Sequence, residues 1–212
     1  MSDTDFFDAE KNKVVGGTLY LVTTPIGNMS DITYRAVKVL SEVDFVAAED
    51  TRNSARLLRF FDISKELVSY HEHNKKSAGE KILTRLQNGE SCALVTDAGT
   101  PAVSDPGEDL VRLCTEAGIP VTAAPGVSAA ITALTLSALV TRRFVFEGFL
   151  PVGGSERAER LAALQSETRT TILYEAPHKL RRTLADLAET LGGERRVSLC
   201  RELTKLNEEV FR

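Results

Sequence analysis

Residues 91–107 read SCALVTDAGTPAVSDPG, a short apolar run that leads directly into a loop rich in glycine and proline. The first six residues are typical of a buried β-strand, and the turn-forming residues that follow should end it. Gly99 permits a positive φ and a close approach of the backbone to a ligand, while Pro101 stiffens the turn. This stretch therefore predicts a strand-end loop that offers backbone N–H and C=O groups to a ribose or an amino-acid moiety. A plain tight turn capped by Asp97 is the alternative.

The same alternation of strand and helix extends on both sides of this stretch. Strands are expected at residues 18–23, 45–48, 67–70, 91–96 and 120–123, and helices at 32–43, 53–61, 77–88 and 107–117. Ser30 or Asp31 is expected to cap the first of these helices. Repeated strand–helix units with short connections predict an α/β domain, in which a mostly parallel sheet has helices on both faces.

Three of these strands end in loops that contain glycine or proline, at residues 24–28, 97–107 and 124–129. The handedness of parallel crossovers places all loops that follow strands at one edge of the sheet. Ligands of open α/β sheets bind beyond the carboxyl ends of the strands. We therefore expect the three loops to converge on one binding site. Ser128 would face the ligand there, unless it is an ordinary helix cap.

A second alternating block follows a strongly apolar helix expected at residues 128–139. Its strands are expected at residues 143–149, 170–174 and 196–201, and its helices at 156–167 and 177–191. The sequence thus predicts a disordered leader at residues 1–16, an N-terminal α/β domain at 17–127 and a second, mixed α/β domain at 128–212. We expect a ligand cleft between the two domains, which is a common location for such sites.

The composition of the 212-residue chain is that of an ordinary globular protein, with 42% hydrophobic and 26% charged residues. The net charge of −4 argues mildly against nucleic acid, but local arginine clusters leave RNA binding open. Neither GxGxxG nor a P-loop occurs, so a nucleotide-like ligand would need another binding mode. A polar start without a long apolar run, and three cysteines without CxxC spacing, predict a cytoplasmic protein with reduced thiols.

Candidate acid–base groups follow the second and third strands. Glu49 and Asp50 are adjacent carboxylates at a strand end, where either could bind a hydroxyl or take its proton. Pairing with Arg52 in a solvated turn is the plain alternative. His71 and His73 lie on one side of an extended segment, but zinc needs three or four ligands and no cysteine pair or HExxH motif supplies them. We therefore expect no metal and interpret this segment as a polar rim that contacts substrate.

Several motifs, taken in order, resemble one known family. They are TLYLVTTPIGN (18–28), VAAEDTRN (46–53), LVTDAGTPAVSDPG (94–107), PGVSA (125–129), FEGFLP (146–151), YEAPH (174–178) and RELTK (201–205). From about residue 17 to residue 212 the chain resembles the ribosomal RNA small-subunit methyltransferase I group, within the tetrapyrrole (corrin and porphyrin) methylase superfamily. The order of EDTRN, DAGTP with SDPG, and RELTK makes this resemblance specific.

The resemblance implies two α/β domains with S-adenosylmethionine between them, in a homodimer without a metal. It implies methyl transfer to the ribose 2′-hydroxyl of a cytidine in 16S ribosomal RNA of the small subunit. Carried onto this chain, the residues implied to bind the cofactor are Pro25, Asp97, Ala98, Gly99, Thr100, Val103, Ser104, Ser128, Ala129 and Tyr174. Those expected to contact the RNA are Asn28, Arg52, His73 and Arg157.

The chain departs from the family pattern in two places. A lysine usually follows the FEGFLP motif, whereas PVGGSER offers only Arg157, and family members extend beyond RELTK. The second domain is therefore expected to be truncated at its C-terminal end. For catalysis, Glu49, Asp50, His71 or Asp97 is the expected base that helps the ribose hydroxyl to attack. A methylase of corrin or porphyrin rings and a non-catalytic, cofactor-binding RNA module are the rival interpretations.

Overall fold

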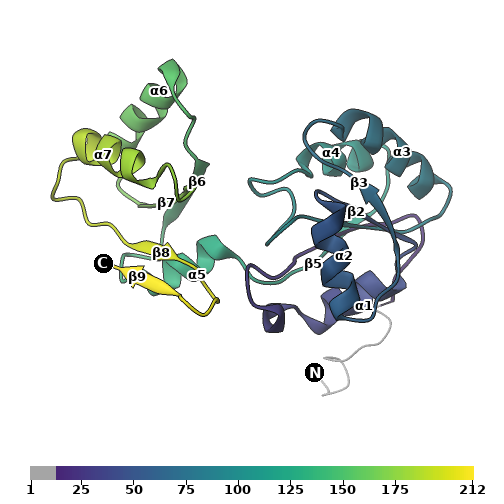
Figure 1. Cartoon of the computed structure of the whole chain (residues 1–212). Coiled ribbons are helices and arrows are strands. Elements are labelled where there is room, and N and C mark those ends of the chain that lie inside the picture. The colour runs from purple at the N-terminus through teal and green to yellow at the C-terminus, as the bar shows by residue number, and fades with distance from the viewer. Residues whose placement is uncertain (1–12) are drawn as a thin grey trace. The chain divides into compact units, whose positions relative to one another are not determined.

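The computed structural model describes residues 13–212, and the chain divides into two compact units, Met1–Ser128 and Ala129–Arg212 (Figure 1). Most of the leader expected at residues 1–16 lies outside the described residues. The sequence placed the domain boundary between residues 127 and 128, next to the junction of these units. Every sheet and every hydrophobic cluster lies within one of the two units.

The first unit is built on a five-stranded sheet in the order β3-β2-β4-β1-β5, in which every neighbouring pair is parallel. Its strands are β1 (Leu19–Val22), β2 (Phe45–Ala48), β3 (Glu66–Ser69), β4 (Cys92–Val95) and β5 (Val121–Ala124). Its helices are η2 (Met29–Asp31), α1 (Tyr34–Glu42), α2 (Thr51–Phe60), α3 (Lys75–Gln87) and α4 (Glu108–Glu116). The predicted parallel sheet is confirmed.

Helices cover both faces of this sheet. Successive residues of a strand point to opposite faces and so pack against different helices. On one face, Val22 and Val46 pack against apolar residues of α1 and α2. On the other face, Phe45 and Leu94 pack against apolar residues of α3 and α4. The helices after β1 and β2 therefore share one face and those after β3 and β4 share the other (Figure 1). Right-handed crossovers require this arrangement for the observed strand order.

The strand order creates a topological switch point between β1 and β4. These two strands are neighbours in the sheet, yet the chain leaves β1 for α1 on one face and leaves β4 for α4 on the opposite face. In open α/β sheets, ligands bind beyond the carboxyl ends of strands at such a point. The fold itself thus selects the loops after β1 and β4 as a candidate site.

The start of α1 differs from the sequence-based expectation. Thr33 caps the helix, and its hydroxyl accepts a hydrogen bond from the Ala36 N–H at 3.1 Å. Ser30 and Asp31, the predicted caps, lie in the short helix η2 instead. Asn28 caps η2 and accepts a hydrogen bond from the Ser30 N–H at 3.0 Å. The prediction was wrong because four residues with capping side chains occur within six positions.

The second unit is a mixed α/β unit, as expected. It contains the parallel pair β6 (Phe144–Phe149) and β7 (Thr170–Tyr174) and the antiparallel pair β8 (Leu199–Arg201) and β9 (Glu209–Phe211). Its helices are α5 (Ala129–Leu136), α6 (Gly154–Gln165) and α7 (Leu180–Leu191). Its main cluster of buried residues is small and consists of Ala130, Leu134 and Ile172, with Phe146 and Tyr174 packed against it.

Two further features bear on the sequence-based expectations. None of the helices within residues 13–212 combines the length and the apolar character that a membrane span requires. All three cysteines are free thiols; Cys92 and Cys114 are buried in the first unit, and Cys200 is partly buried in the second.

Candidate functional site

The three predicted loops converge at one edge of the sheet in the first unit. The Thr24 N–H donates to the carbonyl of Gly99 at 2.9 Å, and the Gly99 N–H donates to the carbonyl of Thr24 at 3.1 Å. The hydroxyls of Thr23 and Thr100 lie 3.3 Å apart. The third loop joins them through the Thr23 N–H, which donates to the carbonyl of Ala124 at 3.1 Å. Segments distant in sequence therefore meet at the switch point.

The loop between β4 and α4 has an unusual backbone. Ala102 and Ser104 adopt left-handed conformations with φ of 66° and 61°, although neither residue is glycine. Conformations of this kind cost about 1–3 kcal/mol each and cluster where ligands bind. Packing beneath the loop maintains them, since a Cβ on Gly107 would lie 3.0 Å from both the Ala102 nitrogen and the Leu94 side chain. The loop that decided the fold prediction is thus tightly constrained.

Gly126 brings the loop after β5 against the loop after β1. A Cβ at this position would lie 3.0 Å from Cγ2 of Thr23, which is tighter than ordinary van der Waals contact. The hydroxyl of Thr33 donates to the carbonyl of Pro125 at 3.5 Å and ties the start of α1 to the same loop. Two threonine hydroxyls, a glycine and exposed loop backbone therefore surround the strand ends.

Three carboxylates gather beside these loops. Burial raises the pKa of Glu49, and the negative charges of Asp105 and Asp97 raise it further. Burial likewise raises the pKa of Asp105, an effect that a hydrogen bond with Thr96 partly offsets. The carboxylate of Asp97 accepts a hydrogen bond from the Asn53 amide at 3.1 Å. This edge of the sheet therefore has a negative potential that favours a cationic ligand or a shared proton.

Asp105 belongs to this acidic cluster, although the sequence analysis did not single it out. It lies in the SDPG segment, eight residues after Asp97 in the same loop. Its position in the long loop after β4 was the one feature of the sequence that could have indicated this role. That loop returns to the end of β4, where Asp105 forms a hydrogen bond with Thr96. The turn-forming residues around it favoured a plain structural interpretation.

Asp50 has a different environment from Glu49. Its side chain caps α2 by accepting the Arg52 N–H at 2.8 Å, and it also forms an ion pair with the Arg52 guanidinium at 2.7 Å. Hydrogen bonds from Arg52 lower the pKa of Asp50 to about 2. A carboxylate held in this way is a weak base at neutral pH. The plain interpretation as a capped and paired turn therefore accounts for Asp50, and its partner Arg52 is exposed.

The two histidines after β3 differ in exposure. Nδ1 of His71 is buried and has no hydrogen-bond partner within the described part of the chain. His73 is exposed beside it, with the two ring centroids 6.0 Å apart. Across residues 13–212, no group of three or more His, Cys, Asp and Glu side chains is arranged to hold a metal ion.

Arg157, one of the residues expected to contact RNA, is buried in the second unit. Its side chain is only 6% exposed and makes four hydrogen bonds. Two of these reach the Asp186 carboxylate at 2.7 and 2.9 Å, one reaches the carbonyl of Pro151 and one reaches the Thr183 hydroxyl. Because its donors are engaged inside the second unit, the structure does not favour the expected contact with substrate, which stays a prediction. The sequence after FEGFLP gave no indication that the charged side chain of Arg157 would be buried.

The remaining predicted contacts are distributed between the units. Asn28 is exposed at the cap of η2 near the loop after β1. Ser128 and Ala129 lie at the junction between the units. Tyr174 ends β7 in the second unit, where its ring packs edge-on against those of Phe146 and Phe149 at centroid distances of 5.1 and 5.5 Å. Their roles toward a cofactor or an RNA stay predictions.

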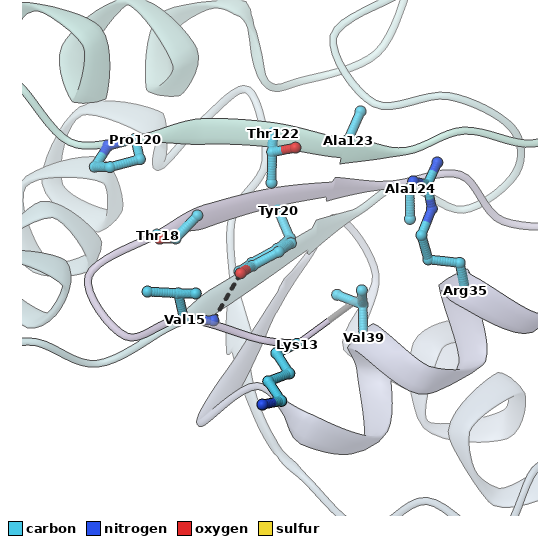
Figure 2. Close-up of a pocket in the computed structure, with 10 residues that line it drawn as sticks. All are labelled: Lys13, Val15, Thr18, Tyr20, Arg35, Val39, Pro120, Thr122, Ala123 and Ala124. Atoms are coloured by element: carbon cyan, nitrogen blue, oxygen red, sulfur yellow. Dashed lines mark hydrogen bonds between the residues drawn. The ribbon is translucent and has the colours of Figure 1, made fainter. Parts of the chain in front are cut away.

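A cavity of about 350 Å³ lies elsewhere in the first unit. Figure 2 shows that it runs along β1 and β5, with Val15 and Thr18 near one end and Arg35 and Ala124 near the other. The Tyr20 hydroxyl on its wall accepts a hydrogen bond from the Val15 N–H at 2.8 Å. The cavity thus follows the face of the sheet beside α1 and does not coincide with the acidic cluster at the ends of β2 and β4.

The sequence matches a known protein family and many curated proteins. Residues 18–212 match the family model of the Tetrapyrrole (Corrin/Porphyrin) Methylases. The chain is 52% identical over 196 residues to the ribosomal RNA small subunit methyltransferase I of Synechocystis sp., covering 92% of this chain and 70% of that protein. It is also 52% identical over 194 residues to the protein of the same name from Pseudomonas aeruginosa, covering 92% and 69%.

Solved structures share the fold at much lower sequence identity. Cobalt precorrin-4 methyltransferase superposes with a TM-score of 0.68 at 19% identity, covering 92% of this chain and 84% of that one. Uroporphyrin-III-C-methyltransferase from Thermus thermophilus gives a TM-score of 0.63 at 22% identity, covering 92% and 83%. These two likenesses establish the architecture.

Proposed function

This chain belongs to the ribosomal RNA small subunit methyltransferase I family of the tetrapyrrole methylases, and we propose that it transfers a methyl group from S-adenosylmethionine to small-subunit ribosomal RNA. The proposed acceptor is the ribose 2′-hydroxyl of a cytidine in 16S ribosomal RNA. The observation that carries the proposal is the identity of about one half with the ribosomal RNA methyltransferases, together with a constrained loop site at the switch point.

The residues at the switch point fit S-adenosylmethionine chemically. The cofactor carries a sulfonium, an ammonium group and a ribose. Glu49, Asp97 and Asp105 supply negative charge without a metal, which suits the cationic groups. The hydroxyls of Thr23 and Thr100 and the backbone of the loop, which is exposed at residues 97–98 and 103–104, are suited to the ribose and the amino-acid moiety. When bound, the cofactor supplies an electrophilic methyl group.

The chain's own residues have two tasks in this reaction. The first is to hold the acceptor oxygen in line with the methyl group, since positioning alone contributes about 7–11 kcal/mol to such reactions. The second is to accept the proton of a hydroxyl that is a poor acid. Glu49 is our candidate for this base, because its raised pKa brings it nearer to neutrality than the lowered pKa of Asp50. His71 and Asp97 are the alternatives beside it.

Tritiated methyl transfer to 30S subunits, followed by mapping of the modified nucleotide, tests the proposal. We expect label in one cytidine of the 16S ribosomal RNA, resistant to alkali at its 3′ side because a 2′-O-methyl group blocks cleavage. Label in a precorrin but not in 30S subunits would support the rival tetrapyrrole methylase. Cofactor binding by calorimetry without any label transfer would support the non-catalytic RNA-binding module.

We further propose that the active form is a cytoplasmic homodimer that needs no metal ion. The family resemblance supports these points, and each has a direct measurement. Sedimentation equilibrium should give twice the mass of the 23.1 kDa chain. Turnover on 30S subunits should be unchanged by a chelator once the magnesium that the ribosome needs has been restored. Fractionation of cells should recover the protein in the soluble fraction and not with the membranes.

A further inference from the structure

The two units differ in charge, and the bulk value conceals the difference. Residues 129–212 contain 13 lysines and arginines and 11 aspartates and glutamates, a net charge of +2, whereas residues 1–128 contain 13 and 19, a net charge of −6. An RNA backbone is attracted by clustered cations and repelled by carboxylates. A phosphate-binding surface is therefore to be sought on the second unit.

Close ion pairs neutralise some of the basic side chains of the second unit. Arg160, Arg169 and Arg201 form ion pairs with Glu147, Glu167 and Glu209. Three cations that lie close together at the start of α7 lack such a close ion pair. Among the described residues, the side chains of Lys179 and Arg181 have no acidic partner. The Arg182 side chain is 63% exposed, and its ion pair with Asp186 is long, at 4.0 Å.

Helix stability does not explain these three cations. They lie at or within the first turn of α7, which contains no acidic residue and whose cap makes no side-chain hydrogen bond. Positive charges at the N-terminus of a helix oppose the helix dipole and lower its stability. Their concentration there is expected if an anion approaches this end of the helix.

The surroundings of this basic cluster suit a nucleic-acid backbone. Because β6 and β7 are parallel, the loop after β6 and the start of α7 lie at the same edge of their sheet. In that loop a Cβ on Gly153 would lie 3.9 Å from the Arg182 guanidinium, and space around Gly154 is open. Phe149, which is 53% exposed, ends β6 at this edge. Cations beside an exposed aromatic ring and a glycine loop are typical of RNA-contacting surfaces.

The buried Arg157 holds this surface in place. It binds Asp186 and Thr183 of α7 and the carbonyl of Pro151 in the loop after β6. The Thr183 hydroxyl in turn donates to Glu175, which caps the turn before α7 by accepting the Ala176 N–H. The two segments that flank the basic cluster are thus tied together from beneath, so the cations are presented by a rigid support.

We propose that Lys179, Arg181 and Arg182, together with the Gly153–Gly154 loop, form a binding site for phosphates of the RNA substrate. This inference rests on the proposed function and gives it a docking surface. The site replaces Arg157, whose donors are occupied, as the RNA contact of the second unit. Its cations bind phosphate as charges and carry no base specificity.

The test compares R181Q/R182Q with R142Q/R143Q in the full chain. Both pairs are adjacent, exposed arginines of the second unit, but Arg142 and Arg143 precede β6 and so lie at the opposite end of the parallel pair. Affinity for 30S subunits is measured at several salt concentrations. For R181Q/R182Q we expect at least tenfold weaker binding, and a slope of log K against log salt reduced by about 1.4 to 1.8, the loss of two phosphate contacts. For R142Q/R143Q we expect less than a twofold change.

Further readouts separate this inference from the proposed function. Cofactor affinity measured by calorimetry should be unchanged in both variants, and R181K/R182K should restore the salt slope because lysine also binds phosphate. Equal weakening by both glutamine pairs, or an unchanged slope, overturns the inference even if the wild type methylates 30S subunits. If R181Q/R182Q bound poly-glutamate more weakly but kept full affinity for 30S subunits, the surface would be assigned to an acidic protein. That result would also overturn the inference. If the wild type transfers no label yet the slope falls as expected, the proposed activity fails and the phosphate site stands.

Discussion

At the scale of single residues, neighbouring carboxylates have opposite roles. Glu49 is half-buried among negative charges, and its pKa is raised, whereas the adjacent Asp50 is held by Arg52 with a pKa of about 2. We expect Glu49→Gln to lower the turnover number at least tenfold when the cofactor is saturating. Asp50→Asn is the matched control, because asparagine also caps helices, and it should retain most of the activity. Equal losses in single-turnover methyl transfer would show that Glu49 is not the base.

The raised pKa of Glu49 also predicts a pH dependence of stability. When the pKa of a carboxyl group is higher in the folded state, the unfolded state binds fewer protons than the folded state between the two pKa values. The contribution of that group to stability therefore falls as pH rises. The window begins at the ordinary pKa of 4.5 and extends through the raised value. Urea unfolding of Glu49→Gln and wild type should therefore show an advantage of the variant that grows from pH 4.5 to neutrality. A constant difference would contradict the raised pKa.

Arg157 shows that residue type alone does not reveal a role. We expect Arg157→Ala to destabilise the second unit by about 3 kcal/mol, the lower end for breaking a buried ion pair, because the Asp186 side chain is 29% exposed. Thermal unfolding followed by circular dichroism measures the change. Arg160→Ala removes the ion pair of a 44% exposed arginine on the same helix and should cost less than 1 kcal/mol. Similar losses in the two variants would mean that the Arg157 network contributes no special stability.

At the scale of secondary structure, apolar patterning predicted most of the elements of the first unit. Strands β1, β2 and β4 are short runs that are buried on both faces, so hydrophobicity and turn residues mark them clearly. Element ends were less predictable. The helix expected from residue 177 begins at Leu180, because residues 176–179 form a turn closed by the Lys179 N–H and the carbonyl of Ala176. Pro177 was compatible with either the first turn of a helix or a tight turn.

Convergence of the loops was predictable, whereas the chemistry of the site was only partly so. Parallel strands force loops after β1, β4 and β5 to one edge, and this follows from topology without side-chain detail. The contrast between Glu49 and Asp50, and the inclusion of Asp105, depend on burial and on charges contributed by other segments. Sequence spacing does not encode those distances.

The cap of α1 provides a test at this scale. Thr33→Ala removes the acceptor of the Ala36 N–H, and we expect a loss of about 1 kcal/mol in the free energy of unfolding. Ser30→Ala alters the predicted but unused cap and should change stability by less than about 0.5 kcal/mol. Urea titrations of the two variants measure both values. A larger loss for Ser30→Ala would restore the original assignment of the cap.

At the scale of the whole molecule, the two units bury very different amounts of apolar surface. The first has a five-stranded sheet with a cluster of large side chains on each face. The second has two separate two-stranded sheets, and its hydrophobic cluster contains three buried residues. Two-stranded sheets are marginal without further packing, and regions with few buried apolar contacts open first.

We therefore expect the second unit to open at lower denaturant than the first. In native-state hydrogen exchange under increasing urea, the amide of Ile172 in β7 should exchange with a smaller opening free energy than that of Leu94 in β4. Thiol labelling gives an independent reading, because burial raises the pKa of Cys92 and raises that of Cys114 to about 11. Both should resist labelling at urea concentrations where β7 has already exchanged, while the partly exposed Cys200 reacts. Identical opening free energies for Ile172 and Leu94, with all three thiols labelled together, would mean that the two units unfold as one cooperative body.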